Sequence, residues 1–377
     1  MTGEQIMFIK TYRDFSEITD GEVTSAEELE QNGFYSSLDW YANLVNTTLG
    51  SEDAVRIYRL EAAPEGQGGR SLLFARCLGE TRSPLTPRTL FSLTGPYSVL
   101  FEPSLPPGTV NAEALATSLA GYISKEKPIW DVLHFDCLDP DSTFFGPFVH
   151  ALRQNGYRVQ PYFHFGNWYE PVAGLSLDEY LNRRPSALRN TLKRKLRRLE
   201  KSGAGRFDLS TGREDLEPAI SAYHQIYRAS WKQAEPFPNF TEGLIRAAAA
   251  AGSLRIGVLY IEEEPAAAQV WIAARGRATI FKLAYDQRFK EYSAGSLLTL
   301  HMLQHALESD GMEEIDFGRG DDPYKSQWMS CRRERWGIMA FSSKTVRGTL
   351  AAGIHLGGGK IKKIGSGMVD FTKTLWR

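Results

Sequence analysis

The chain has 377 residues, of which 42% are hydrophobic and 24% charged, a composition typical of a soluble globular protein of one or two domains. Its formal net charge of −1 creates no overall field that would favour a polyanionic partner. The three cysteines are widely separated, which argues against a disulfide framework and favours a reducing compartment.

The first residues lack an apolar core of the length found in signal peptides, and the sequence contains no apolar run long enough to span a bilayer as a helix. We therefore expect a cytoplasmic protein. Peripheral contact with a membrane stays open at this point.

The first half of the sequence predicts seven elements. Alternating apolar residues indicate strands, and apolar residues at helical spacing indicate helices. The predicted elements are strands at 54–61, 71–78 and 89–102, a helix at 111–125, a strand at 131–138, a helix at 143–155 and a strand at 158–170.

The second half repeats this order approximately. The predicted elements are a strand at 206–210, helices at 216–233 and 242–251, a hairpin of strands at 254–261 and 266–274, a strand at 278–289, a helix at 295–309, a strand at 313–317, a short helix at 324–330 and a strand at 336–342 that closes the sheet. The repeated order predicts two copies of one mixed α/β (α+β) domain. We place the first copy at 1–172 and the second at 206–342.

A basic helical segment, 173–205, joins the two predicted domains. Ser176 and Glu179 have the spacing of a capping box, and Pro185 suits the first turn of a second helix. Residues 183–206 hold ten Lys or Arg and one acidic residue. Residues 343–377 form a second basic stretch, which we predict to be a partly ordered tail.

The junction between the strand at 278–289 and the helix at 295–309 is unusual for its four consecutive small residues. A helix N-terminus presents free N–H groups and a partial positive charge, so small side chains there let an anion approach closely. The segment suits a pyrophosphate, although a plain strand-to-helix turn relieved by Gly295 would also explain it. The candidate contacts are Tyr292, Ser293, Ala294, Gly295, Ser296 and Leu297.

The segments FKLAYDQRFKEYSAGSLL and DFGRGDDPYKSQW, in this order around a buried helix, resemble the Gcn5-related N-acetyltransferase (GNAT) superfamily. More narrowly, the second half resembles the acetyltransferases of cellulose biosynthesis (CelD/BcsL-like) and the related Fem-type aminoacyltransferases. The resemblance implies two tandem GNAT-like domains, each a mostly antiparallel twisted sheet flanked by helices. It also implies an acyl-CoA co-substrate, expected to be acetyl-CoA, and no metal. The corresponding turn of the first half, 93–115, contains prolines and no small-residue run, so we expect no coenzyme there.

The resemblance also suggests catalytic residues. Tyr324 stands where the superfamily often places a tyrosine that protonates the leaving thiolate, and Lys325 matches a lysine of Fem-type enzymes that orients an anionic group of the acceptor. Asp286 is a candidate for accepting the proton of the amine. The ordinary alternatives are a packing tyrosine, a solvated lysine and a turn-capping aspartate.

Three further polar residues are candidates for reading the acceptor. Alternation along the strand at 313–317 places Asp316 opposite its apolar neighbours, towards a cleft or solvent. Arg319 and Asp322 follow at the mouth of the same cleft. His301 and His305 are spaced for a metal, but no third ligand is evident, so polar histidines on a helix are the preferred interpretation.

Three functions follow as hypotheses. The first is an N-acyltransferase that acetylates an amine, such as an amino sugar of exopolysaccharide or cell-envelope synthesis. The second is a Fem-type ligase that uses aminoacyl-tRNA, with the basic segment on phosphates. The third is a non-catalytic module that docks on an anionic membrane or lipid-linked substrate through the basic segment.

Overall fold

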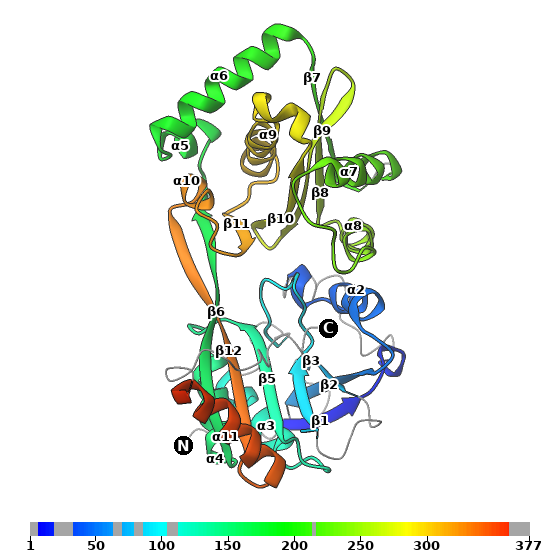
Figure 1. Ribbon diagram of the computed structural model, residues 1–377, viewed down its shortest axis with the longest axis vertical. Coiled ribbons are helices and arrows are strands. Elements are labelled where there is room, and N and C mark those ends of the chain that lie inside the picture. Colours follow the sequence, from blue (N-terminus) through cyan, green and yellow to red (C-terminus); the bar gives the residue numbers. More distant parts are fainter. Residues whose placement is uncertain are drawn as a thin grey trace.

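The computed structural model describes residues 7–18, 33–62, 70–78, 86–103, 112–212 and 216–361. They form two lobes that share one continuous sheet of twelve strands (Figure 1). Within these described ranges, no helix combines the length and the apolar character needed to cross a membrane.

Among the described residues, the first lobe contains six strands, three helices and two short 3₁₀ turns before the chain leaves it. These are β1 (Met7–Tyr12), η1 (Phe15–Glu17), η2 (Phe34–Ser36), α2 (Leu38–Thr48), β2 (Asp53–Ala62), β3 (Arg70–Leu78), β4 (Thr89–Ser92), α3 (Ala112–Ile123), β5 (Val132–Leu138), α4 (Phe145–Gln154) and β6 (Tyr157–Pro171).

Two helices and then the second lobe follow, and the chain finally returns to the first lobe. These elements are α5 (Leu177–Asn182), α6 (Ser186–Ser202), β7 (Gly205–Ser210), α7 (Glu217–Ala229), α8 (Phe240–Ala250), β8 (Leu254–Ile261), β9 (Glu264–Ala274), β10 (Arg277–Tyr285), η3 (Gln287–Tyr292), α9 (Ala294–Glu308), β11 (Glu314–Arg319), α10 (Lys325–Trp328), β12 (Cys331–Ser342) and α11 (Val346–Ile361).

The predicted repeat is confirmed, because both lobes follow the same order of strands and helices. In each lobe the fourth and fifth strands run parallel, β4 with β5 and β10 with β11, whereas the other described strand pairs are antiparallel. The predicted hairpin of β8 and β9 is also confirmed. The fold is therefore a mixed α/β architecture with two related halves.

The position of the last strand was predicted wrongly. The sequence analysis assigned 336–342 to the sheet of the second half, but β12 lies between β5 and β6 of the first lobe. The reason is packing: Ile338 and Ala340 are fully buried in the core of the first lobe. The domain limits that we drew at 172, 205 and 342 stay predictions, although residues 331–342 pair with strands of the first half.

Other segments also differ from their predictions. Of the strand predicted at 89–102, only Thr89–Ser92 is extended and paired, and the rest is a loop. The sequence analysis did not predict β1 or α2. The start of the predicted tail forms helix α11 against β12, and residues after 361 lie outside the described part of the chain.

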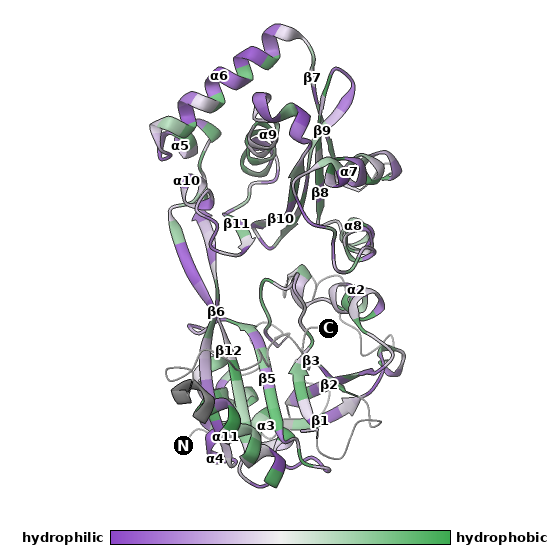
Figure 2. Cartoon of the chain, in the orientation of Figure 1, coloured by the Kyte–Doolittle hydropathy of each residue, from purple (hydrophilic) through white to green (hydrophobic). Residues whose placement is uncertain are grey.

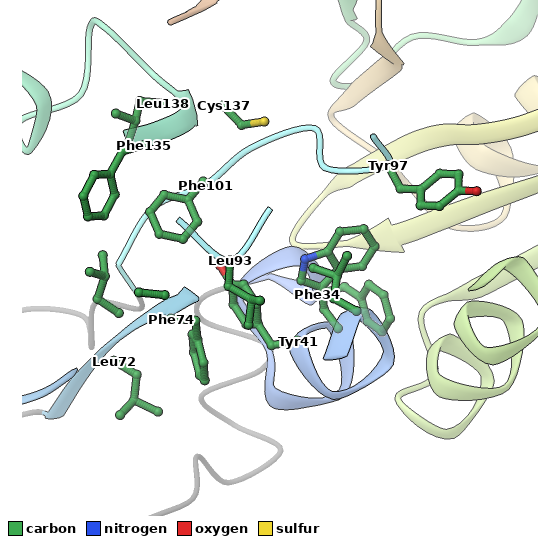
Figure 3. Close-up of a cluster of buried hydrophobic side chains, with 14 of the residues drawn as sticks. Phe34, Tyr41, Leu72, Phe74, Leu93, Tyr97, Phe101, Phe135, Cys137 and Leu138 are labelled. Atoms are coloured by element: carbon green, nitrogen blue, oxygen red, sulfur yellow. The ribbon is translucent and has the colours of Figure 1, made fainter. Parts of the chain in front are cut away.

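An apolar contact between α2 and α8 joins the lobes. The Trp40 ring lies 5.7 Å from that of Phe240, and the Asn43 amide donates to the Phe240 carbonyl at 3.1 Å. Tyr97, in the loop that follows β4 of the first lobe, stacks on Phe240 at 4.1 Å. Figure 3 shows Tyr97 at one end of the buried cluster of the first lobe, beside strands of the second lobe. The lobes therefore share a hydrophobic core at this contact.

The basic segment forms α5 and α6, which pack against α9 in the second lobe. The capping box of Ser176 and Glu179 is present, and α6 ends at Gly203 with a left-handed φ of +62°. Leucines on one side of α6 are buried, so hydrophilic and hydrophobic residues alternate along this helix (Figure 2). One predicted member of the basic surface is not part of it: Arg184 is buried and paired with Glu170 at 2.5 Å.

Candidate active site

The candidate site lies where β10 and β11 separate. These parallel strands pair only over 277–279 and 314–316, and both become irregular immediately afterwards. Gly318 takes a left-handed φ of +62° in β11, and a Cβ there would approach the Ile280 carbonyl to 3.3 Å. A glycine at this position thus lets β11 turn away from β10.

A pocket of about 260 Å³ occupies this separation. Its walls come from both lobes, as the loop before Phe101 contributes a rim to strands of the second lobe. The lining residues are Pro96, Tyr97, Val99, Lys232, 280–283, 317–319, Asp322, Tyr324 and Lys325. Of the ten residues proposed from the sequence as catalytic or acceptor-binding groups or as small residues opening α9, those in the wall are Arg319, Asp322, Tyr324 and Lys325.

Tyr324 lines the pocket. The side chain is 42% exposed, and its ring packs edge-on against Phe317 at 5.9 Å. Burial, reinforced by the nearby Asp322 carboxylate, raises the pKa of the Tyr324 phenol. The phenol therefore stays protonated at neutral pH, which is the state that a proton donor requires.

Lys325 also lines the pocket, but its ammonium group is already engaged. It donates to the carbonyl of Arg319 at 2.7 Å and to that of Gly320 at 3.1 Å, and Asp322 lies 3.6 Å away. Burial lowers the pKa of Lys325. Through these contacts Lys325 stabilises the loop after β11. It is buried, so it is not the solvated lysine that was considered as an alternative.

Asp286 lies outside the pocket and caps the turn η3. Its carboxylate accepts from the Arg288 backbone N–H at 2.9 Å and from the Arg288 guanidinium at 2.9 Å. Burial alone would raise its pKa, but the contacts with Arg288 hold the pKa of Asp286 below its ordinary value. The position supports the alternative of a turn-capping residue and gives no support to a general base.

Asp316 was expected to face a cleft or solvent, and this expectation was wrong. Its carboxylate is 4% exposed and accepts hydrogen bonds from the Asn167 amide and the Gly318 N–H, both at 2.6 Å, and from Arg333. Although burial by itself would raise it, the charge of Arg333 and the Asn167 hydrogen bond hold the pKa of Asp316 low. The residue is a structural tie between β11, β6 and β12.

The small-residue junction forms the N-terminus of α9. Ser293 is the residue before the helix and adopts a left-handed φ of +57°, and its side chain makes no capping hydrogen bond. Ala294 is fully buried, and a Cβ at Gly295 would lie 3.3 Å from the Tyr285 ring. As in any helix, the first-turn N–H groups of α9 have no acceptors within the helix. Small side chains are required beside them because Ala294 is buried and Gly295 lies close to Tyr285 of β10.

The basic face of α6 adjoins this helix terminus. Lys195 donates to the Glu291 carbonyl, and the Arg198 guanidinium lies 5.0 Å from the centre of the Tyr292 ring. The outward side of α6 forms a shallow hollow lined by Asn190, Lys193, Arg194, Arg197, Arg198 and Lys201.

Several residues of the pocket were missed by the sequence analysis. Tyr97 donates to Glu235 at 2.6 Å, and the ammonium of Lys282 lies 2.5 Å from the same carboxylate. Lys232 lies in the wall near this group. These residues come from three separate segments, and no spacing within one segment relates them. The apolar strand pattern around Lys282 was the only available signal, since a lysine within such a strand marks a polar environment.

The two histidines considered as metal ligands lie on α9 with other partners. His301 stacks on Phe207 at 4.6 Å, and His305 lies 3.5 Å from Asp310. Over the described part of the chain, no three His, Cys, Asp or Glu side chains converge as a metal site would require.

Comparisons with known proteins agree with this geometry. Residues 186–326 match the family described as an acetyltransferase (GNAT) domain. Its range runs from α6 to α10 and thus includes the junction at α9 and most of the pocket wall. Searching curated protein sequences gives no match. The match and the fold together support a GNAT-type acyltransferase domain in the second half of the chain.

Solved structures with the same fold cover nearly the whole chain. The crystal structure of FemX superposes with a TM-score of 0.60 at 13% identity, covering 88% of this chain and 97% of that one. A C-terminal domain of a putative lysylphosphatidylglycerol synthetase from Agrobacterium fabrum gives a TM-score of 0.51 at 13% identity, with the same coverages of 88% and 97%. At such identities these likenesses show the fold alone.

The placement of Asp316 predicts a structural role that stability measurements detect. Replacing it, as Asp316→Ala, leaves the buried Asn167 amide and the half-buried Arg333, which keeps Glu314, without their shared partner, so the free energy of unfolding should fall by about 1–3 kcal/mol. Urea denaturation of the full chain measures this change. Asp322→Ala is the matched control, since that carboxylate side chain is 63% exposed and its loss should change stability by less than about 0.5 kcal/mol. Equal stabilities of the two variants would contradict the assignment.

Proposed function

We propose that this protein is an N-acyltransferase that moves an acyl group, expected to be acetyl, from acyl-CoA to an amine. The observation that carries the proposal is the pocket between β10 and β11, with the protonated Tyr324 in its wall, inside the segment that matches the GNAT acetyltransferase domain. The acceptor class expected from the sequence resemblance is an amino sugar of exopolysaccharide or cell-envelope synthesis. The narrower likeness to acetyltransferases of cellulose biosynthesis stays a prediction.

The reaction requires an unprotonated amine and a leaving group that accepts a proton. The amine nitrogen forms a bond to the thioester carbonyl carbon, the carbon–sulfur bond breaks, and the sulfur leaves with its electron pair. In this proposal the Tyr324 phenol donates the proton that the sulfur needs. The proton released by the nitrogen passes to solvent at the pocket mouth, where Asp322 is largely exposed. The co-substrate supplies the activated acyl group, and the protein supplies position and proton transfer.

The residues that would hold the coenzyme are those opening α9. Its free N–H groups and the positive end of the helix dipole fit a pyrophosphate, and the residues at 293–296 keep the approach clear. The cations of α6 next to this terminus add favourable charge. Tyr285 lies against Gly295, while Leu283, two residues earlier in β10, lines the pocket, so the strand connects the two parts of the site.

Gly295→Val tests the coenzyme position. A valine places two methyl groups against the Tyr285 ring and over the first-turn amides, so binding of acetyl-CoA should weaken by tenfold or more. Calorimetric titration of both proteins with acetyl-CoA measures the change. Gly121→Val serves as the control, because a Cβ at Gly121 meets no atom within 4 Å. Equal affinities of wild type and Gly295→Val would exclude this binding position.

Tyr324→Phe tests the proton donor. The variant keeps the ring that packs on Phe317 but lacks the hydroxyl, so turnover should fall by about 10²–10⁴-fold while acetyl-CoA still binds. Steady-state kinetics combined with the calorimetric titration separates the two effects. Unchanged turnover would remove Tyr324 from the mechanism.

A second candidate function, aminoacyl transfer from tRNA as in Fem-type enzymes, is favoured by the hollow along α6. Arg198 in this hollow lies over the Tyr292 ring, and Lys195 of the same helix contacts Glu291, so cations of α6 lie next to the residues that precede α9. Phosphodiester binding at such a surface is strongly salt-dependent.

The double variant Arg194→Gln/Arg197→Gln separates the two donors. If tRNA is the donor, electrophoretic mobility shifts at low salt should show binding that this variant weakens by roughly an order of magnitude and that rising salt abolishes. If the donor is acyl-CoA, the wild type should bind acetyl-CoA and should not retain tRNA at physiological salt. Glu217→Gln, a change far from α6 on α7, controls for the general effect of surface charge.

A further inference from the structure

The pocket carries more positive charge than its own carboxylates offset. Four cationic side chains line it, Lys232, Lys282, Arg319 and Lys325, whereas Asp322 is the one carboxylate among the lining residues. Charges removed from water are costly unless a partner offsets them, so the partner of each cation decides what the pocket can bind.

Two of the four cations are neutralised inside the protein. The ammonium of Lys282 lies 2.5 Å from Glu235, a carboxylate just behind the pocket wall. Lys325 donates to the carbonyls of Arg319 and Gly320 and lies 3.6 Å from Asp322. The positive charges of Lys282 and Lys325 are therefore offset by groups of the protein, and neither needs a ligand as a partner.

Lys232 has no such partner. It lies after α7, with its ammonium 5.8 Å from the Tyr227 ring and 5.9 Å from the Trp231 ring. No described carboxylate forms an ion pair with it. Burial and the neighbouring charge of Lys282 lower the pKa of Lys232 to about 8, so the group is still mostly charged at neutral pH.

The hydrogen bonds of the Arg319 guanidinium are also incomplete. One end of its guanidinium lies 3.0 Å from His164 Nε2, and its plane lies over the Phe165 ring at 4.6 Å. The Nη1 atom is buried and has no hydrogen-bond partner. Burial lowers the pKa of His164, so this imidazole is neutral and does not offset the arginine charge. Among the described residues, Arg319 likewise has no carboxylate partner.

We propose that Lys232 and Arg319 together form an anion subsite that binds a carboxylate or phosphate group of the acceptor. The inference rests on the proposed function only in naming the ligand an acceptor, since the subsite itself is defined by the two unpaired cations. A pocket of about 260 Å³ accommodates one such group together with a short linker to the amine. The acceptor is thus expected to be an acidic amine, either an amino acid or peptide end with a free carboxylate, or a phosphorylated amino sugar.

Binding of simple anions tests the subsite without any turnover. The thermal midpoint of the full chain is measured with inorganic phosphate and with malonate, and sodium chloride keeps the ionic strength constant. Each anion should raise the midpoint of the wild type, and Lys232→Met should remove most of that increase. Lys232→Arg keeps the charge and should preserve it, as should Arg194→Gln/Arg197→Gln, which alters only the α6 surface. An increase that Lys232→Met leaves unchanged would overturn the subsite.

The same variant should fold normally. Removing an unpaired, partly buried cation relieves an unfavourable charge, so Lys232→Met without added anion should have a thermal midpoint equal to or above that of the wild type. A clear decrease would mean that Lys232 has an internal stabilising role, and the subsite assignment would then fail.

Matched pairs of amines identify the anion and separate this inference from the proposed function. The pairs are an amino acid with its amide and an amino sugar phosphate with the unphosphorylated sugar, each offered with acetyl-CoA. One charge-assisted hydrogen bond corresponds to a tenfold or greater change, so KM should be at least about tenfold lower for the anionic member of one pair. The pair that shows the preference identifies a carboxylate or a phosphate. Lys232→Met should abolish the preference and Lys232→Arg should retain it.

The remaining outcomes are equally decisive. Turnover of all amines with equal KM would overturn the subsite and leave the acyltransferase intact. No turnover with any amine, together with phosphate stabilisation that depends on Lys232, would contradict acyl-CoA-dependent transfer and leave the subsite intact. Loss of kcat in Lys232→Arg at unchanged KM would assign Lys232 to proton transfer instead of anion binding.

Discussion

The buried carboxylate of Asp316 fixes β11 in place at the point where β10 and β11 separate. It accepts hydrogen bonds from Asn167 on β6, Arg333 on β12 and the Gly318 N–H on its own strand. These contacts fix β11 to the strands on one side, so β11 is not available to follow β10 on the other. The separation of β10 from β11, the pocket between them and the direction of the loop that carries Tyr324 all depend on this arrangement.

The two lobes are related in fold but play different parts at the site. In the first lobe, β4 and β5 also pair in parallel over three residues. The loop that follows β4 crosses to the second lobe, where Tyr97 stacks on Phe240 and hydrogen-bonds Glu235. The first half of the chain therefore forms one wall of the pocket in the second half.

The distribution of charge in the pocket separates structural cations from cations available to a ligand. Lys282 and Lys325 are held by groups of the protein, and their positive charges stabilise the walls. Lys232 and Arg319 line the same pocket, and neither forms an ion pair with a described carboxylate. A protein tolerates unpaired buried charge where function requires it, because the ligand completes the missing contacts. Lys232 lines the pocket and its pKa is lowered mainly by burial, whereas Asp286 lies outside the pocket and its pKa is held low by its contacts with Arg288.

The sequence by itself determined the local features. Apolar periodicity predicted most strands and helices, and the capping box at Ser176, the stop at Gly203 and the small residues opening α9 were all readable from neighbouring residues, because such signals act within a few positions of the chain. The resemblance carried by the second half also located Tyr324, which the structure places in the pocket wall. Sequence reasoning could reach this far because these features depend on short-range contacts.

Only the tertiary structure decided which strands pair and which polar groups meet. Alternation along β11 suggested that Asp316 faces outward, but β6 and β12 cover it with Asn167 and Arg333, which lie about 150 residues before it and 17 residues after it. Strand β12 was assigned to the wrong lobe for the same reason, since its apolar pattern is compatible with the strands of either lobe. The anion subsite joins Lys232, Arg319 and a wall from Tyr97, and a one-dimensional pattern does not encode such contacts between distant segments.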